Sequence, residues 1–378
     1  MTQDFQRRLP SYGASAGTNT SWSDRIHVDP ILLLLITGVV LFGLVILSSA
    51  VDGNEALFDV QVRRIGVAYA ALIIAAQLPP AMYLRWAPFL YLVGLGLLIL
   101  VLFVGIEVKG SQRWIDIPGL FRFQPSELMK IAVPMAVAWY LQQRVLPPSI
   151  KHTFFSLVII ALPAFAIGVE PDLGTSILVA GAGVSVLLLA GLSWRWILGA
   201  FTLVAAAAPL LWQFVLRDYQ RQRILTLFDP QSDPLGAGWN IIQSTTAIGS
   251  GGIFGKGLYQ GSQSYLDFLP EARTDFIVAV VGEELGFVGI AFLLTLYLLI
   301  IARGLYLASQ AGSTFGRLVA GALVLTFFIY LFVNIAMVSG ILPVVGVPLP
   351  LVSYGGTSAI TLMAGFGIIM SMRTHKAW

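Results

Sequence analysis

The polar stretch at residues 236–275 is where chemistry is easiest to place in this sequence. It interrupts an otherwise apolar chain, it is rich in Gly, Ser, Gln and aromatic residues, and it ends in Asp275 directly before the apolar run 276–281. A carboxylate at the edge of a bilayer is costly unless it is paired or takes part in function. On the residues alone, Asp275 is either a catalytic group or an acid that satisfies the free N–H groups of a helix start.

Glu127 and Lys130 form a second candidate group. Their spacing of three residues places them on one face of a helix, where they can pair. Pro125 and Ser126, just before them, are typical of a first helical turn. An ion pair inside a membrane either locks helix packing or lines a pathway, and the residues leave both interpretations open.

The glycine-rich segment 249–257 (GSGGIFGKG) only superficially resembles a nucleotide loop, because it lacks the Lys-Ser/Thr ending. It is either a re-entrant turn or a nest of backbone N–H groups that, with Lys256, faces an anionic headgroup. The three histidines lie far apart and show no metal-ligand spacing. The chain contains no cysteine, which excludes disulfide and thiolate chemistry.

The composition indicates a polytopic membrane protein. Of 378 residues, 57% are hydrophobic and only 11% are charged, whereas soluble domains carry about 25% charged residues. The net charge of +3 gives no reason to expect a nucleic-acid partner. We expect no cleavable signal peptide, because the first apolar run is too long for one.

These features predict an all-α membrane fold of about ten transmembrane helices, with a large extracytoplasmic loop between the seventh and the eighth. We expect a disordered cytoplasmic tail at 1–28, a single transmembrane domain at 29–373 that includes a long periplasmic loop at 216–275, and a short cytoplasmic tail at 374–378. The predicted spans are 31–50, 64–79, 87–106, 126–142, 152–168, 173–190, 194–215, 276–302, 316–340 and 352–372.

The distribution of positive charge predicts the orientation. With the N-terminus inside, the inside segments hold eleven Lys and Arg residues and the short outside loops hold five. Positive residues concentrate on the cytoplasmic side of membrane proteins. Both termini are therefore expected in the cytoplasm, which agrees with an even number of spans.

Six motifs, in this order along the chain, resemble the SEDS family of shape, elongation, division and sporulation proteins. The resemblance extends over residues 25–373, and the details of the 233–257 region are similar to its RodA (elongation) branch. The motifs are FQPSELMKIAVP (123–134), EPDLGTS (170–176), DPLGAGWNIIQS (233–244), AIGSGGIFGKG (247–257), FLPEARTDFIVAVVGEELGFVG (268–289) and LPLVSYGGTS (349–358).

The resemblance implies a ten-helix peptidoglycan glycosyltransferase of the bacterial inner membrane. Such proteins polymerise lipid II into glycan strands during cell elongation, with a class B penicillin-binding protein as transpeptidase partner and with other membrane proteins of the elongation complex. The family's essential acid maps onto Asp275, and its buried Glu/Lys pair onto Glu127 and Lys130. Arg273 stands where a histidine is expected, so the role of Arg273 is open.

Lipid II polymerisation requires a base for the acceptor hydroxyl and a positive charge for the leaving diphosphate. Asp275 is the expected base or metal ligand. The positive charge would come from Arg113, Arg122, Lys256 or Arg273, or from a divalent cation, Mg or Mn, bound by outer-loop carboxylates. The alternatives to the enzyme are a lipid II flippase and a non-catalytic scaffold of the elongation machinery.

Overall fold

The computed structural model describes residues 26–51, 54–108, 111–117, 121–216, 218–233, 236–261 and 271–375. The predicted disordered tail falls almost entirely outside the described residues. The helices are α2 (Pro30–Ala50), α3 (Glu55–Gln77), α4 (Pro80–Val104), α5 (Pro125–Leu141), α6 (Ile150–Val169), α7 (Leu173–Leu189), α8 (Trp194–Leu210), α9 (Asp218–Phe228), α10 (Ala237–Gly251), α12 (Ile277–Ser309), α13 (Thr314–Val338) and α14 (Thr357–Thr374).

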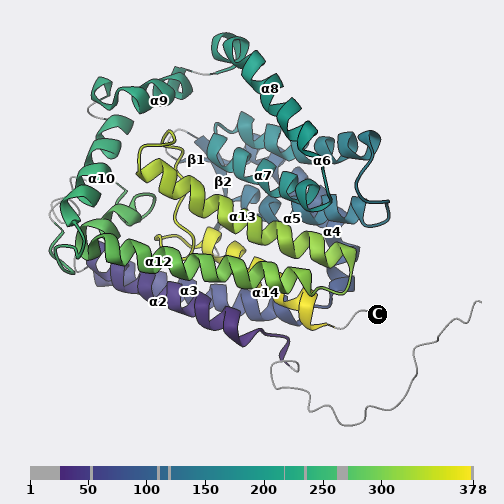
Figure 1. Cartoon of the computed structure of the whole chain (residues 1–378), viewed down its shortest axis with the longest axis horizontal. Coiled ribbons are helices and arrows are strands. Elements are labelled where there is room, and N and C mark those ends of the chain that lie inside the picture. Colours follow the sequence, from purple (N-terminus) through teal and green to yellow (C-terminus); the bar gives the residue numbers. More distant parts are fainter. Residues whose placement is uncertain are drawn as a thin grey trace, which may run out of the picture.

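The long helices pack side by side in one bundle (Figure 1). Helix α14 packs against α3, α12 against both α2 and α13, and α5 against both α4 and α7. Three aromatic side chains tie the last three helices together in the core: Tyr297 lies 5.7 Å from Phe327, and Phe327 lies 5.0 Å from Phe366, between ring centroids. Aromatic pairs at these distances stabilise a core beyond the area they bury.

Local capping explains several helix starts. The Asp29 carboxylate accepts the N–H of Leu32 and is followed by Pro30 at the first helical position of α2. Asn54 accepts the N–H of Leu57 in the same way at the start of α3. Such side chains satisfy backbone donors that a helix start leaves free.

The protein is predominantly helical and apolar, as predicted. Among the residues that the structure describes, five helices are long and apolar enough to cross a membrane, namely α2, α4, α6, α12 and α13, and α7 is a shorter apolar helix. A helix occupies each of the ten predicted segments. The number of helices that cross the membrane, and the side on which the large loop lies, stay predictions.

A small antiparallel sheet departs from the all-α prediction. Strands β1 (Ile106–Val108), β2 (Ser111–Ile117) and β3 (Phe121–Phe123) lie in the order β1-β2-β3 between α4 and α5. The segment Ser111–Ile117 reads SQRWIDI, a partial alternation of polar and apolar residues that favours a strand. Hydropathy alone predicts a loop in this region, because the segment is too polar for a membrane span.

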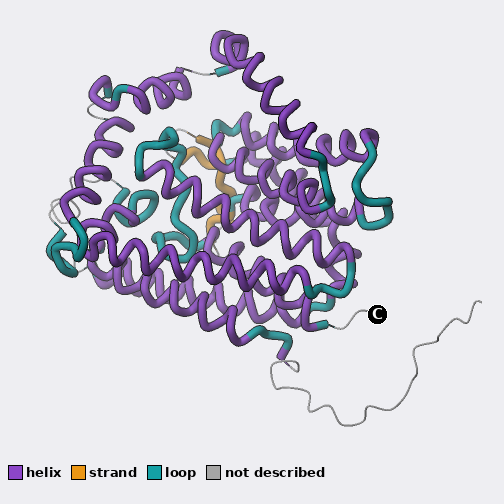
Figure 2. Tube along the Cα trace, viewed as in Figure 1, coloured by secondary structure: helices purple, strands orange, loops and turns teal. Residues whose placement is uncertain are grey.

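The segment 216–275 also contains more regular structure than a polar loop. After a π-helical turn at Leu211–Val215, helices α9 and α10 follow, with a short 3₁₀ turn at Pro230–Ser232 between them. With α8, these helices form an arch outside the main bundle (Figures 1 and 2). Helix α10 then packs against α12.

Helix α12 is interrupted at Gly286, which has φ of +64° and ψ of −160°. The turn 252–257 fills the interruption: it accepts the N–H of Phe287 at 2.9 Å and donates to the carbonyl of Glu283 at 3.0 Å. Backbone groups freed within a membrane helix must find such partners, because no water is available in the bilayer core. The glycine-rich segment is therefore a turn docked on α12.

Candidate active site

The turn 271–276 carries Asp275 and leads directly into α12. Three consecutive carbonyl groups of this turn each accept a hydrogen bond from another part of the chain. The bonds are Tyr354 N–H to Arg273 O at 2.8 Å, Ser353 Oγ to Thr274 O, and Asn334 Nδ2 to Asp275 O at 2.8 Å. The backbone on both sides of the Asp275 side chain is thus fixed.

The donors come from α13 and from the strap, which we define as residues 340–356 between α13 and α14. The strap also passes close to the Asp275 carboxylate: a methyl group on Gly346 would lie 3.5 Å from Asp275 Oδ2. Gly346 has φ of +75°, a conformation that glycine adopts without strain. Asp275 is half-buried in this position.

Asp275 is not the N-cap residue of the helix that follows it. Helix α12 begins at Ile277 and its N-cap residue is Phe276, so Asp275 lies one residue before the cap position.

The predicted pairing of Glu127 and Lys130 is confirmed. Their Oε1 and Nζ atoms lie 2.5 Å apart, and both side chains are buried at the start of α5. Lys130 Nζ also lies 4.7 Å from the ring centroid of Tyr330 on α13, in cation–π geometry. Removing only one partner of such a buried pair strongly lowers the stability of a protein, because the other charge stays buried without compensation.

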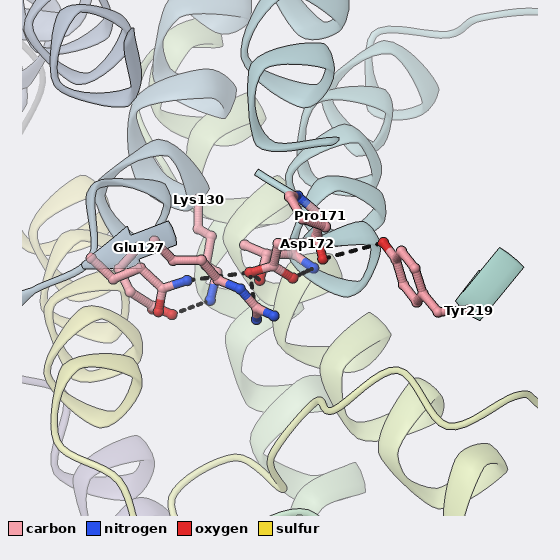
Figure 3. Close-up of polar contacts among 8 residues, drawn as sticks. Glu127, Lys130, Pro171, Asp172 and Tyr219 are labelled. Carbon is pink, nitrogen blue, oxygen red and sulfur yellow. Dashed lines mark hydrogen bonds and ion pairs between the residues drawn. The ribbon is translucent and has the colours of Figure 1, made fainter. Parts of the chain in front are cut away.

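Asp172, which the sequence analysis did not select, gathers several contacts beside this pair (Figure 3). It caps α7 through the N–H and hydroxyl of Thr175, at 3.1 and 2.9 Å. It also accepts a hydrogen bond from Gln124 at 3.4 Å and pairs with Arg113 at 3.2 Å. Asp172 is 4% exposed, so these contacts compensate a charge withdrawn from water.

Glu170 lies two residues before Asp172 and is also buried. Burial, together with the nearby charge of Asp172, raises the pKa of Glu170 to about 8, against the opposing effect of Arg113. This connection between α6 and α7 therefore holds one buried acid in its neutral form near neutral pH, beside another that pairs with an arginine.

The strap connects the two polar groups. A methyl group on Gly174, in the first turn of α7, would lie 2.8 Å from the carbonyl oxygen of Val345, while the next residue, Gly346, faces Asp275. The carbonyl of Val347 accepts the second amide hydrogen of Asn334 at 2.7 Å. The start of α7 and the turn that carries Asp275 therefore both contact the strap at 345–347.

The four predicted cations lie in four different surroundings. Arg113 joins Asp172, and Arg273 donates from Nε to the carbonyl of Ala50 at 3.1 Å, beside the Asp275 turn. The other two pair elsewhere: Arg122 with Asp116 at 3.9 Å on the small sheet, and Lys256 with the fully buried Glu283 at 2.7 Å.

Three residues near the site were not selected from the sequence, although each is a polar residue within or beside an apolar span. Asp172 stands in a Glu-Pro-Asp sequence between two apolar runs, and Asn334 is an amide inside an apolar span. Arg64 is one of the five positive residues counted in the short outside loops, and its guanidinium lies 4.9 Å from the ring centroid of Tyr354 in the strap. Buried or membrane-embedded polar residues of this kind are the signal to follow.

No three His, Asp or Glu side chains gather as a metal-ligand set among the described residues. These side chains therefore offer no candidate ligand set for a divalent cation.

The comparisons with known proteins agree over almost the whole chain. The family model described as "cell cycle protein" for FtsW, RodA and SpoVE matches residues 27–377. The peptidoglycan glycosyltransferase MrdB of Escherichia coli K12 is 54% identical, covering 94% of this chain and 96% of the relative. The probable peptidoglycan glycosyltransferase FtsW of Geobacter metallireducens is 37% identical, covering 92% and 95%.

Two solved structures are similar. A chain of a peptidoglycan synthase complex that coordinates polymerization and crosslinking superposes with a TM-score of 0.80 at 30% identity, covering 90% of this chain and 96% of that one. The rod shape determining protein RodA of Thermus thermophilus superposes with a TM-score of 0.69 at 28% identity, covering 90% and 95%. The chain belongs to the FtsW/RodA/SpoVE family and resembles its RodA members.

Proposed function

We propose that this protein is a peptidoglycan glycosyltransferase that polymerises lipid II into glycan strands during cell elongation. The observation that carries the proposal is the 54% identity, over 94% of this chain, to a relative named for that activity. The geometry adds a half-buried carboxylate, Asp275, on a turn fixed at three successive carbonyl groups.

In the proposed reaction, the C4 hydroxyl of the acceptor sugar attacks the anomeric carbon of a polyprenyl-diphosphate donor. The new C–O bond forms as the bond to the diphosphate breaks, and the configuration at the anomeric carbon inverts. Asp275 takes the hydroxyl proton as general base, a role worth roughly 10²–10⁴-fold in rate. A fixed backbone favours this role because it limits the positions that the carboxylate can sample.

Positive charge must balance the departing diphosphate. Arg273 is favoured among the predicted cations, because it belongs to the same turn as Asp275. Arg113 is favoured next, because its partner Asp172 lies beside the part of the strap that contacts Asp275. Lys256 and Arg122, which pair with Glu283 and Asp116, complete the set for mutational tests.

We assign the buried pair of Glu127 and Lys130 a supporting role. The pair lies where α5 meets α13, and Lys130 contacts Tyr330 one helical turn before Asn334. A fixed pair there holds α5 against the helix that donates to the Asp275 turn. Removing one partner should therefore disturb the site more than removing both.

We place the protein in the bacterial inner membrane as one transmembrane domain at 29–373, with 216–275 in the periplasm and both termini in the cytoplasm. Support comes from the described chain ends, since the His27 and His375 rings stack at 3.7 Å. An even number of membrane crossings brings the two ends together in this way. The partner is a class B penicillin-binding protein; a similar chain comes from a complex that coordinates polymerization and crosslinking.

The test is lipid II polymerisation by the purified protein with its transpeptidase partner, in the presence of moenomycin to silence classical glycosyltransferases. We expect long glycan from the wild type and at least a roughly 10²-fold lower rate from Asp275→Asn, which removes the base. The matched control is Asp218→Asn, because Asp218 lies fully exposed on α9.

Wild-type-level polymer from Asp275→Asn would remove Asp275 from the chemistry. Transfer of lipid II between liposome leaflets without any polymer from the wild-type complex would instead select the flippase. Polymer that depends only on the partner's presence, and not on this chain, would select the scaffold.

A further inference from the structure

Asn334 is a fully buried amide in an apolar helix. It lies in the last turns of α13 and is 0% exposed. A buried amide is costly unless its polar atoms are hydrogen-bonded. Both hydrogens of its Nδ2 atom are used, one on the carbonyl of Asp275 at 2.8 Å and the other on the carbonyl of Val347 at 2.7 Å.

The two acceptors lie on two sides of the Asp275 carboxylate. One is the carbonyl of Asp275 itself, so its position sets the position of the Cα atom that bears the carboxylate. The other belongs to Val347, next to Gly346, which faces Asp275 Oδ2. One side chain thus links the turn that carries the acid to the strap that passes beside it.

Asn334 also connects these irregular segments to the helical bundle. The other two donors to the turn, Tyr354 and Ser353, belong to the strap, so they would move with it. Asn334 belongs to a helix whose preceding turn contacts Lys130 through Tyr330. A rigid helix is a more precise support for a site than a loop.

We propose that Asn334 is a positioning residue for the glycosyl transfer: its amide holds the Asp275 backbone and the strap in the geometry that proton abstraction requires. This inference rests on the proposed function of Asp275. A misplacement of about 1 Å costs on the order of 10²-fold in rate. Loss of the amide is therefore expected to lower kcat by about 10-fold to 100-fold, while KM for lipid II stays within about twofold.

The experiment compares three substitutions in the purified complex with the transpeptidase partner. Asn334→Leu keeps the branched shape in a larger, apolar side chain and removes both donors. Asn334→Asp keeps the shape and size and replaces the donating amide with a carboxyl group. Asn334→Gln keeps an amide on a longer side chain. The control is Thr326→Val on the same helix, because the Thr326 hydroxyl donates only to the carbonyl of Ala322, one turn earlier.

We expect kcat to fall for Asn334→Leu and Asn334→Asp and to be restored in part for Asn334→Gln, with Thr326→Val close to the wild type. The midpoint of thermal unfolding and the yield of complex are measured for each variant, so that a rate is assigned only to folded protein. Equal kcat for Asn334→Leu and the wild type, or for Asn334→Gln and Asn334→Leu, would overturn the proposal.

Asp275→Asn in the same assay distinguishes a failure of the positioning role of Asn334 from a failure of the catalytic role of Asp275. If Asp275→Asn is inactive and Asn334→Leu is fully active, only the positioning role fails. If Asp275→Asn keeps full activity, the catalytic assignment fails, and the positioning role with it.

Discussion

Glu170 shows how the surroundings of one residue set its charge. Burial, supported by the neighbouring Asp172, raises the pKa of its carboxyl to about 8, whereas an exposed glutamate titrates near 4.5. Between these values the folded protein binds one more proton than the unfolded chain. The stability linked to this group is therefore complete below about pH 4.5, declines as the pH rises through this window, and is lost above about pH 8.

Glu170→Gln tests this dependence, because glutamine keeps the shape of the neutral acid and cannot ionise. We expect the midpoint of thermal unfolding of the variant to match the wild type at about pH 4, below both pKa values, and to exceed it by several degrees at about pH 9. Glu55→Gln, at the exposed start of α3, is the control and should show no such difference. A difference between Glu170→Gln and the wild type that is equal at both pH values would contradict the raised pKa.

Individual site residues were predictable where a local pattern reports on them. The pairing of Glu127 and Lys130 follows from helical spacing and is confirmed. The role of Asp275 stays a prediction, although its place on a fixed turn supports it. Asp172 and Asn334 were missed because their partners lie far away in the sequence and in different elements. Gln124 is 48 residues from Asp172, and Asp275 is 59 residues from Asn334, so no local pattern records these contacts.

At the scale of elements, the end of α10 and the turn after it dock closely onto α12. A methyl group on Gly251 would lie 1.9 Å from the carbonyl oxygen of Gly282, and one on Gly255 would lie 2.0 Å from that of Glu284. These distances are far below van der Waals contact. The close approach brings the turn 252–257 within hydrogen-bonding reach of the interrupted part of α12.

Gly251→Ala is therefore expected to push the turn away from α12 and to lower stability by about 1–3 kcal/mol, as overpacking does. Gly249→Ala is the matched control: it lies on the same helix, and a methyl group there would meet nothing within 4 Å. Because alanine favours helices over glycine, this control should be neutral or slightly stabilising.

The measurement is thermal unfolding together with hydrogen exchange of the amides of the turn. In Gly251→Ala, the N–H of Lys256, which donates to Glu283, should exchange faster than in the wild type. If Gly251→Ala changed neither the exchange rate of the Lys256 N–H nor the midpoint of thermal unfolding, the close contact of α10 and the turn 252–257 with α12 would be contradicted.

Helix boundaries were less predictable than the presence of helices. Hydropathy identifies the residues that lie within the bilayer, whereas a helix can begin or end outside it. The predicted span 64–79 overlaps α3, which begins earlier, at Glu55, because Asn54 caps it, and which ends at Gln77. The polar first turns of α3 carry Asp59 and Gln61, which an apolar window excludes. The interruption at Gly286 had no signal either, since its partner is a turn about thirty residues earlier in the chain.

For the whole molecule, the two described ends of the chain meet around one carboxylate. Asp29, at the start of α2, is 1% exposed and binds Arg303 near the end of α12, at 2.7 Å, and Arg373 near the end of α14, at 3.0 Å. Burial opposes the ionised form, but the hydrogen bonds from Arg303 and Leu32 and the charges of both arginines outweigh it and lower the pKa of Asp29. The first and last helices are thereby joined at the end of the bundle away from Asp275.

Asp29→Asn should open this junction without removing the helix cap, because asparagine is also a good N-cap residue. Breaking a buried pair costs about 3–5 kcal/mol; since both arginines are partly exposed to solvent, we expect a smaller loss, on the order of 2 kcal/mol. Thermal unfolding in detergent measures the loss. The control is Asp218→Asn, which removes a pair at 3.5 Å between the fully exposed Asp218 and the partly exposed Arg221. Because Asp29 lies far from the site, kcat per folded complex should stay at the wild-type value. A lowered kcat with unchanged stability would show instead that the junction acts on the site, through α12 or α14.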